Sequence, residues 1–268
     1  YPEKNNKIGD VIFEIKNYNV FDNSGKQKVK DINLTLKKGE ILGISGLIGS
    51  GRTELISSIF GTYEGYRKGE CYFKGEKINI KSTKEALKMG ISMVPEDRKK
   101  DGIIADMSVE KNMTLSNLDN YTKKLNYVDV YNEDKDVKKY IEILKIKTSG
   151  TDLEIKNLSG GNQQKVVLAK NLMVNPKIII LDEPTRGVDV GAKYEIYKNI
   201  VELAEQGISI IMVSSELPEI LGISDRIVVM HEGEVKGEFI NKNITQEMIM
   251  ETAIGGDKNE FGNEIKES

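Results

Sequence analysis

The sequence predicts an α/β fold with a parallel sheet, and two patterns support that prediction. Apolar runs that suit buried strands alternate with helical stretches after residue 161, and such alternation requires crossovers between parallel strands. Earlier in the chain, a glycine-rich turn at residues 46–53 joins a strand to a helix. The length of 268 residues fits one large α/β domain or two ordinary domains.

Composition excludes several classes of protein. A formal net charge of −3 provides no general basic field, so nucleic acid is not expected as a partner. Hydrophobic residues make up 38% and charged residues 30%, which excludes wholesale disorder. Apolar runs such as residues 178–181 stop after about four residues, whereas a membrane span needs about 20. The single cysteine, Cys71, rules out an internal disulfide and is expected to pack as a small hydrophobic residue.

The first third of the chain predicts mainly strands. Residues 1–10 are polar and aperiodic, as a linker would be. Strands are expected over residues 11–15, 32–36 and 40–44, as a sheet edge that leads into the glycine-rich turn. Residues 71–73 and 78–80 predict a hairpin around residues 74–76, or a loop crossing. Ser82 and Glu85 predict a capping box for a short helix that ends at Gly90.

The middle of the chain, from about residue 108 to 161, changes to a helical pattern. Val137, Tyr140, Ile141 and Leu144 fall on one helical face, which predicts a helical insertion or subdomain. The alternation that follows comprises a helix around Val166, a strand over 177–182, a helix over 192–205 closed by Gly207, and a strand over 208–213. A β pair around residues 232–234, a helix over 245–254 and a charged tail beyond Gly255 complete the chain.

The glycine-rich turn is a candidate phosphate loop. It matches G-x-x-x-x-G-K-[ST] at every position except the lysine, and it comprises Gly46, Leu47, Ile48, Gly49, Ser50, Gly51, Arg52 and Thr53. Glycines let consecutive N–H groups face phosphate oxygens, and Thr53 offers a hydroxyl to Mg²⁺. The alternative is a strand-to-helix turn with no ligand.

Two carboxylates end the apolar run at residues 178–181. Asp182 suits the Mg²⁺ shell, and Glu183 suits the orientation or deprotonation of an attacking water, both of which phosphoryl transfer requires. The alternative is an acidic pair that caps the next helix.

A third motif, Leu-Ser-Gly-Gly-Asn-Gln-Gln at residues 158–164, opens a helix shortly before Asp182. A helix start with a hydroxyl and free N–H groups suits an anion, although alone it would indicate only a helix cap. The three motifs in this order resemble the ATP-binding cassette (ABC) family, and the resemblance covers residues 11–239.

The resemblance implies a P-loop NTPase (RecA-like) core with an antiparallel β subdomain and a helical signature subdomain. It places a nucleotide-binding domain over residues 11–243, a helical subdomain at about 105–162, and a C-terminal helix and polar tail over 244–268. ATP and Mg²⁺ are the implied cofactors, and Glu183 is the implied catalytic residue. The implied metal ligands are Thr53, Asp182 and Glu96, and further nucleotide contacts come from Glu54, Phe21, Ser159, Gly160, Gly161, Gln163 and Ser215.

Several segments narrow the resemblance. PEDRKKDG at 95–102, DEPTRGVDVGAKYEIY at 182–197 and SSELPEILGISDR at 214–226 are similar to the second of two tandem nucleotide-binding halves in bacterial monosaccharide importers of the ribose, galactose and xylose type, the xylose branch above all. This similarity implies that residues 1–10 join a first half. It also implies permease partners, an indirect partner in a periplasmic or lipid-anchored sugar-binding protein, and a peripheral location on the cytoplasmic face of the membrane.

Three positions that contact the γ-phosphate in most members of the family differ from the family pattern. Arg52 replaces a lysine, Glu96 replaces a glutamine and Ser215 replaces a histidine. Guanidinium is larger and planar, a carboxylate cannot donate as an amide does, and serine is shorter than imidazole. We expect a site that binds ATP and hydrolyses it poorly, while the intact signature completes the site of the partner half. The alternative is that each change is neutral.

Some residues also have simpler interpretations. His231 is expected to be a surface or structurally satisfied histidine rather than a catalytic one. The run at residues 98–100 is either a solvated charge cluster or a contact with the membrane subunit. For adenine stacking, Tyr18 is the alternative to Phe21, and a core role is the alternative for both. At the level of function, a soluble ABC protein or a nucleotide-sensing half without turnover are the alternatives to a transport ATPase.

Overall fold

The computed structural model describes residues 1–122 and 127–255, and its largest sheet is the parallel one. This six-stranded sheet has the order β10-β9-β3-β8-β7-β6, in which β10 alone runs antiparallel to its neighbour. Its strands are β3 (Ile41–Gly46), β6 (Ile91–Val94), β7 (Ile178–Asp182), β8 (Ser209–Val213), β9 (Arg226–His231) and β10 (Glu234–Ile240). Every residue of β7 and β8 is buried, which explains their near-continuous apolar sequence.

A second, antiparallel sheet contains the first two predicted strands. Its order is β2-β1-β4-β5, with β1 (Val11–Phe21), β2 (Gln27–Lys37), β4 (Tyr66–Phe73) and β5 (Glu76–Ile78). The expectation that β1 and β2 form an edge of the sheet that enters the glycine-rich turn was therefore wrong, and only β3 does so. Their alternating apolar pattern suits a sheet with one buried face, which is typical of antiparallel strands. The predicted hairpin is confirmed as β4 and β5.

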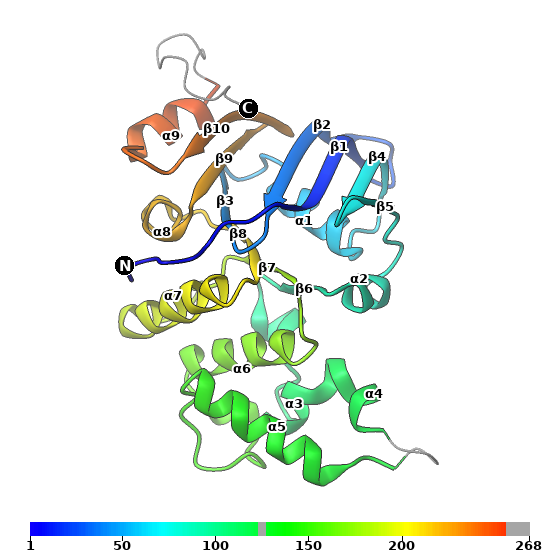
Figure 1. Cartoon of the computed structure of the whole chain (residues 1–268), viewed down its shortest axis with the longest axis vertical. Helices are drawn as coiled ribbons and strands as arrows, with labels where there is room; N and C mark the ends of the chain where they lie inside the picture. The colour runs from blue at the N-terminus through cyan, green and yellow to red at the C-terminus, as the bar shows by residue number, and fades with distance from the viewer. Residues whose placement is uncertain (123–126, 256–268) are drawn as a thin grey trace.

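The parallel sheet is covered on both faces. Along β7, Ile179 and Leu181 belong to the hydrophobic core shared with α6 to α9, whereas Ile178 and Ile180 belong to the core shared with α1 and the antiparallel sheet. The covering helices are α1 (Arg52–Phe60), α2 (Thr83–Met89), α6 (Gly160–Leu172), α7 (Val190–Glu205), α8 (Leu217–Ile223) and α9 (Gln246–Ala253). Figure 1 shows the antiparallel sheet and the α7 side on opposite flanks of the parallel strands.

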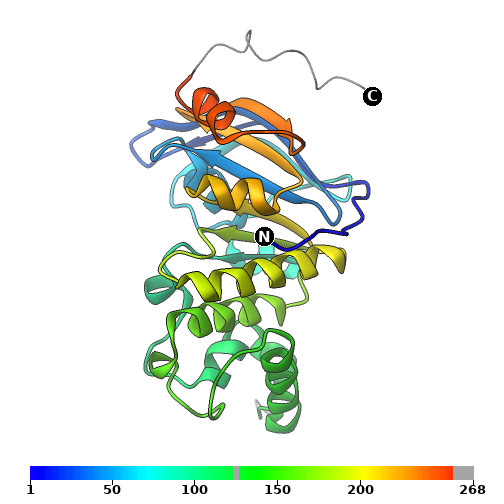
Figure 2. The same cartoon turned by 90° about the vertical axis from the view of Figure 1, so that its left-hand side faces the viewer.

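The predicted helical subdomain lies at the end of the molecule remote from the antiparallel sheet, in both Figure 1 and Figure 2. It contains α3 (Val109–Thr114), α4 (Leu118–Tyr121) and α5 (Val130–Ile143), which pack beside α6. On α5 the predicted apolar face is confirmed, because Val137 is fully buried and Tyr140 and Ile141 pack on the same core. The fold is thus the predicted P-loop NTPase core with a β subdomain and a helical subdomain.

Local signals were accurate at several helix ends. The side chain of Ser82 accepts a hydrogen bond from the Glu85 amide at the start of α2, although the Glu85 carboxylate bonds to the amide of Lys81 rather than back to Ser82. Gly90 closes α2 with φ of 83°, a left-handed conformation that favours glycine. Among the described residues no helix is both long and apolar enough to span a bilayer. The predicted charged tail beyond Gly255 lies outside the described residues.

The first ten residues have no regular secondary structure but lie against the core. Lys4 Nζ is 2.9 Å from Asp225 Oδ1, and Asn6 donates to the Gly39 carbonyl oxygen at 2.8 Å. The ring of Tyr1 lies 5.1 Å from the ring of Tyr197 on α7. This segment is therefore fixed to the body of the protein, and its role as a linker to another half stays a prediction.

Candidate nucleotide site

The phosphate loop, residues 46–53, connects β3 to α1 in a conformation that requires its glycines. Gly49 and Gly51 have φ of 81° and 95°, which an L side chain rarely adopts. A Cβ on Gly51 would also lie 2.8 Å from the carbonyl oxygen of Lys28. Within the described chain, the buried Ser50 Oγ has no hydrogen-bond partner. An unpaired hydroxyl at the start of a nine-residue helix fits the binding of a phosphate group.

Arg52, in this loop, has its hydrogen-bond partner outside the loop. Its side chain is 8% exposed, and Nη1 donates to the carbonyl oxygen of Ser214 at 2.9 Å. Burial lowers the pKa of Arg52, against the opposing effect of Glu183 and Asp182. The guanidinium thus joins the loop to the end of β8, a contact that the sequence could not reveal.

Asp182, at the end of β7, shares a pocket of about 960 Å³ with Thr53. Burial, together with the charge of Glu183, raises the pKa of Asp182 to about 7, while Arg52 lowers it. Carboxylate and hydroxyl oxygens are ligands that Mg²⁺ prefers. The donor set therefore fits a magnesium ion, with Thr53 and Asp182 as its candidate ligands.

Glu96, the third predicted metal ligand, also lines this pocket, but its carboxylate forms an ion pair with Arg186. Arg186 lies in the loop that follows β7, at residues 183–189. Any contact of Glu96 with a metal would compete with this pair. Glu96 thus lies in the same pocket as Thr53 and Asp182, as expected, but its ion pair with Arg186 was not expected.

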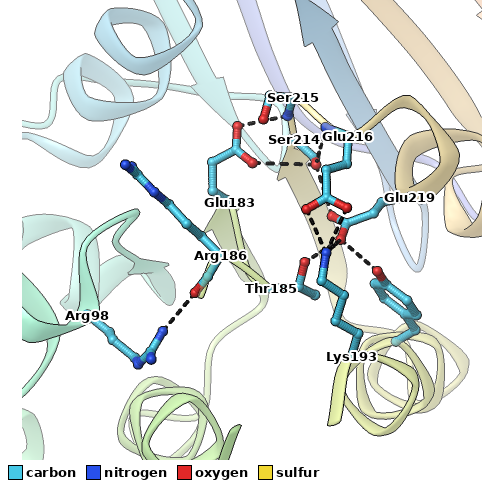
Figure 3. Close-up of polar contacts among 10 residues, drawn as sticks. Arg98, Glu183, Thr185, Arg186, Lys193, Ser214, Ser215, Glu216 and Glu219 are labelled. Carbon is cyan, nitrogen blue, oxygen red and sulfur yellow. Dashed lines mark hydrogen bonds and ion pairs between the residues drawn. The ribbon is translucent and has the colours of Figure 1, made fainter. Parts of the chain in front are cut away.

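Glu183 follows Asp182 with φ of 46°, in the left-handed region. Its Oε1 accepts a hydrogen bond from the Ser215 amide at 2.7 Å, and Ser214 Oγ lies 3.5 Å from Oε2 (Figure 3). Burial raises the pKa of Glu183, and the hydrogen bonds from Ser215 oppose that rise. Three predicted elements of the site, Arg52, Glu183 and Ser215, are therefore gathered at the ends of β7 and β8.

A buried carboxylate that sequence reasoning missed lies behind these residues. Glu219 on α8 is 1% exposed and accepts hydrogen bonds from Tyr197 Oη at 2.6 Å and Ser214 Oγ at 2.9 Å. Thr185 Oγ1 also donates to Glu219, and Lys193 Nζ lies 3.3 Å away (Figure 3). The sequence does place Glu219 between the apolar residues Leu217 and Ile220, and a charged residue in such a position could have indicated a buried carboxylate. This cluster joins the loop after β7, helix α7 and the end of β8.

The signature turn, residues 158–164, begins α6. The Ser159 side chain caps the helix by accepting from the amide of Asn162, and Ser159 itself is exposed. Gly161 is buried, and a Cβ there would lie 2.6 Å from Cβ of Ala192. The side-chain Nε2 of Gln163 donates to the carbonyl oxygens of Ile155 and Leu158, so this amide group is already paired within the chain. None of the signature residues lines the pocket that holds Thr53 and Asp182.

The aromatic candidates for adenine stacking differ in exposure. Tyr18 is 1% exposed and its hydroxyl is 3.1 Å from Ser58 Oγ, so Tyr18 is a core residue. Phe21 is partly exposed and stacks on Tyr66 with ring centroids 4.8 Å apart, and Lys68 Nζ lies over its ring. One face of Phe21 is thus covered by another aromatic ring. His231 is the last residue of β9 and lies opposite Glu234 of β10 in the antiparallel register.

The fold and the residues gathered at its strand ends define an ATP-binding cassette. The sequence profile described as ABC transporter matches residues 29–186, and the chain belongs to this family.

Particular relatives agree with this class. The chain is 54% identical over 256 residues to the xylose import ATP-binding protein XylG of Photobacterium profundum and 50% identical to XylG of Escherichia coli K12, covering 95% of this chain and 50% of each relative. The chain thus spans about half the length of these curated relatives. A solved ATP-binding cassette of an ABC transporter, MJ1267 in its ADP conformation, superposes with a TM-score of 0.75 at 25% identity and covers 91% of this chain and 95% of that one.

Proposed function

We propose that this chain is the second nucleotide-binding half of the ATPase in a bacterial ABC monosaccharide importer, one for a pentose such as xylose. The observation that carries the proposal is the 54% identity, over 95% of the chain, with a protein named for xylose import. That the chain corresponds to half of this relative supports its assignment as one of two halves. The segments at residues 95–102 and 214–226 favour the second half.

In this proposal the phosphate loop holds the phosphates of ATP. The amides of residues 46–53 and the unpaired Ser50 hydroxyl face the phosphate oxygens, and Glu54 follows in the first turn of α1. Thr53 and Asp182 hold Mg²⁺, which when bound neutralises charge on the phosphates. Glu183 orients the attacking water and accepts its proton, and Phe21 supplies the stacking surface for adenine.

The site of this chain is proposed to be the weaker of the pair. Arg52 is already bonded to the Ser214 carbonyl oxygen and Glu96 to Arg186, so each side chain has a partner within the chain besides any nucleotide. The Ser215 side chain is short where imidazole is usual. Catalysis of phosphoryl transfer depends on positioning, so these departures lower turnover while they preserve binding.

The signature turn is proposed to act on the other half. Ser159 is exposed at the start of the 13-residue helix α6, whose first turn also contains Gly160 and Gly161. These groups offer a hydroxyl and helix N–H donors to the γ-phosphate of a nucleotide that is bound by the other half. This chain thereby completes the more active site.

The partners follow from the same proposal. Transmembrane permease subunits dock on this chain at the cytoplasmic face of the membrane, and a sugar-binding protein outside the membrane acts on it indirectly through them. Lys100, an exposed member of the basic run that also lines the pocket beside Glu96, is the proposed permease contact. Nucleic acid has no role in this proposal.

Reconstitution tests the proposal. The full-length protein and its permease would be placed in vesicles, and ATP hydrolysis would be measured with xylose, ribose or galactose supplied with the binding protein. We expect hydrolysis coupled to uptake of xylose, with a small effect of Glu183→Gln and a large effect of the corresponding change in the first half. Hydrolysis that is indifferent to permease and sugar would indicate a soluble ABC ATPase and overturn the proposal.

A further inference from the structure

Arg98 joins three segments that are distant in sequence. It begins the single-turn helix η1 (Arg98–Gly102), two residues after Glu96. Nη1 donates to the carbonyl oxygen of Arg186 at 2.7 Å (Figure 3). Nη2 donates to the carbonyl oxygen of Gly187 at 3.1 Å. Nε lies 3.5 Å from Oε1 of Gln163 on α6. The first member of the basic run at residues 98–100 is therefore a bridge between segments of the fold, whereas Lys99 and Lys100 are exposed, as a solvated cluster would be.

The guanidinium of Arg98 also fills the space that Gly160 leaves. A Cβ built on Gly160 would lie 2.7 Å from Nη2 of Arg98 and 3.1 Å from the Gly187 carbonyl oxygen. The first turn of the signature helix thus packs directly on the guanidinium. Glycine at this position thus allows the close approach of Arg98, and its backbone is not left-handed.

A second contact joins the segment at residues 96–98 to the loop after β7. Arg98 reaches from residues 96–98 to the backbone of the loop after β7, and Arg186 of that loop returns an ion pair to Glu96. Burial lowers the pKa of Arg98, against the charge of Asp97, yet its donors go to carbonyl oxygens rather than to a carboxylate. A planar fork held by two successive carbonyl groups fixes direction as well as distance.

We propose that Arg98 is a positioning residue that fixes the signature turn against residues 186–187, and so determines how this chain completes the nucleotide site of the other half. The inference rests on the proposed function, in which the signature acts on the partner nucleotide. Arg98 touches no nucleotide itself. Its effect passes through Gly160 and Gln163 to Ser159, and it connects the pocket at Glu96 to the signature.

Four variants of the full-length protein in its permease complex test this inference. Arg98→Ala removes the fork, Arg98→Lys keeps the charge without the fork, and Gly160→Ala displaces the guanidinium while leaving Arg98 in the sequence. Lys99→Ala is the control, because Lys99 is the adjacent exposed cation and its side chain has no role in the bridge. The steady-state kcat and KM for ATP are measured, together with photoaffinity labelling by an azido-ATP, with labelled peptides assigned to each half by mass spectrometry.

We expect Arg98→Ala to lower kcat/KM and labelling of the first half by about tenfold or more, since misplacing a positioning group by about an ångström has effects of this order. Labelling of the phosphate loop of this chain stays within twofold of the wild type. Arg98→Lys retains part of the activity, Gly160→Ala resembles Arg98→Ala, and Lys99→Ala is unchanged. The three altered variants thus share a pattern that a general loss of folding would not produce, because such a loss would lower labelling of both halves together.

Other outcomes overturn the inference in distinguishable ways. If the wild-type complex is active and Arg98→Ala is as active as Lys99→Ala, the role of Arg98 is contradicted and the proposed function is left intact. Equal loss of labelling in both halves, seen also in Arg98→Lys and Gly160→Ala, shows a merely structural role. A wild-type complex without ATP hydrolysis, or without a second nucleotide-binding half, contradicts the proposed function and removes the partner site on which the inference depends.

Discussion

Arg52, in the phosphate loop, donates a hydrogen bond to the main-chain carbonyl oxygen of Ser214, 162 residues further along the chain. The next residue, Ser215, donates its main-chain amide to the carboxylate of Glu183. The charge of Glu183 in turn raises the pKa of Arg52, against the effect of burial. The cation of the phosphate loop, the candidate catalytic carboxylate and the end of β8 thus form one connected group. A nucleotide that draws Arg52 away from Ser214 would also change the surroundings of Glu183.

The first prediction concerns Arg52 and nucleotide affinity. Arg52→Ala removes the cation, and we expect ATP binding to weaken by about 1–3 kcal/mol, as for a charge-assisted hydrogen bond. Arg52→Lys supplies a compact ammonium that fits beneath the phosphates, and should tighten binding. Titration with a fluorescent ATP analogue measures both, with Lys74→Ala in the exposed hairpin turn as the control. Equal affinities in all forms would show that Arg52 never contacts phosphate.

The second prediction separates the two nucleotide sites. Ser159→Arg places a bulky side chain on the exposed first turn of α6, and we expect it to stop transport-coupled hydrolysis by the full complex. Ser215→Ala keeps the amide that binds Glu183 and should reduce the rate by less than about threefold. Ser159 is preferable to Gly161 as a test site, because a side chain at Gly161 would clash with Ala192 and disturb folding.

Steady-state ATP hydrolysis by the reconstituted complex measures these variants. Ser159→Ala is compared with it, since it removes the hydroxyl and the helix cap without adding bulk, and we expect a smaller loss. If Ser215→Ala is the more damaging change, the roles of the two sites have been assigned in reverse.

The third prediction concerns Glu219 and stability. Glu219→Ala leaves the buried hydroxyl groups of Thr185, Tyr197 and Ser214 without their acceptor, and we expect the free energy of unfolding to fall by about 1–3 kcal/mol. Glu216→Ala is the control, because its exposed ion pair with Lys193 contributes about 0–1 kcal/mol. Urea denaturation measures both. Equal losses in the two variants would contradict a special role for the buried carboxylate.

The fourth prediction concerns pH and Asp182. An aspartate whose pKa is raised to about 7 by burial keeps its proton in the folded state while the unfolded chain releases it near pH 4. Stability of the nucleotide-free protein is therefore unaffected by this group below pH 4, decreases as the pH rises toward 7, and stays at the lower value above that. Asp182→Asn removes this loss, and we expect it to stabilise the protein by about 2–4 kcal/mol at pH 8 and by little at pH 4.

Denaturation of Asp182→Asn and of the wild type at pH 4, 6 and 8, without nucleotide or metal, measures this difference. The same variant should lose Mg²⁺-dependent strengthening of ATP binding, because one candidate ligand is gone. A stability difference that does not vary with pH would contradict the raised pKa of Asp182.

Local rules were sufficient for much of the fold. The strands β7 and β8, the left-handed glycines of the phosphate loop and the caps at Ser82 and Gly90 were predictable because each depends on periodicity or turn chemistry within a few residues. The motifs at residues 46–53, 158–164 and 182–183 indicated the class of protein for the same reason. Their roles toward nucleotide stay predictions.

Contacts between distant segments were decided only by the tertiary structure. Nothing in the sequence near Arg52 indicates that its guanidinium turns to Ser214, and nothing near Arg98 indicates that its partners are the carbonyl groups of residues 186 and 187. Glu219 likewise gathers groups from three elements. The sequence thus determined where strands, turns and the glycine-rich loop lie, because those depend on local backbone preference. Folding decided which charges meet, because that depends on how the sheets and helices pack.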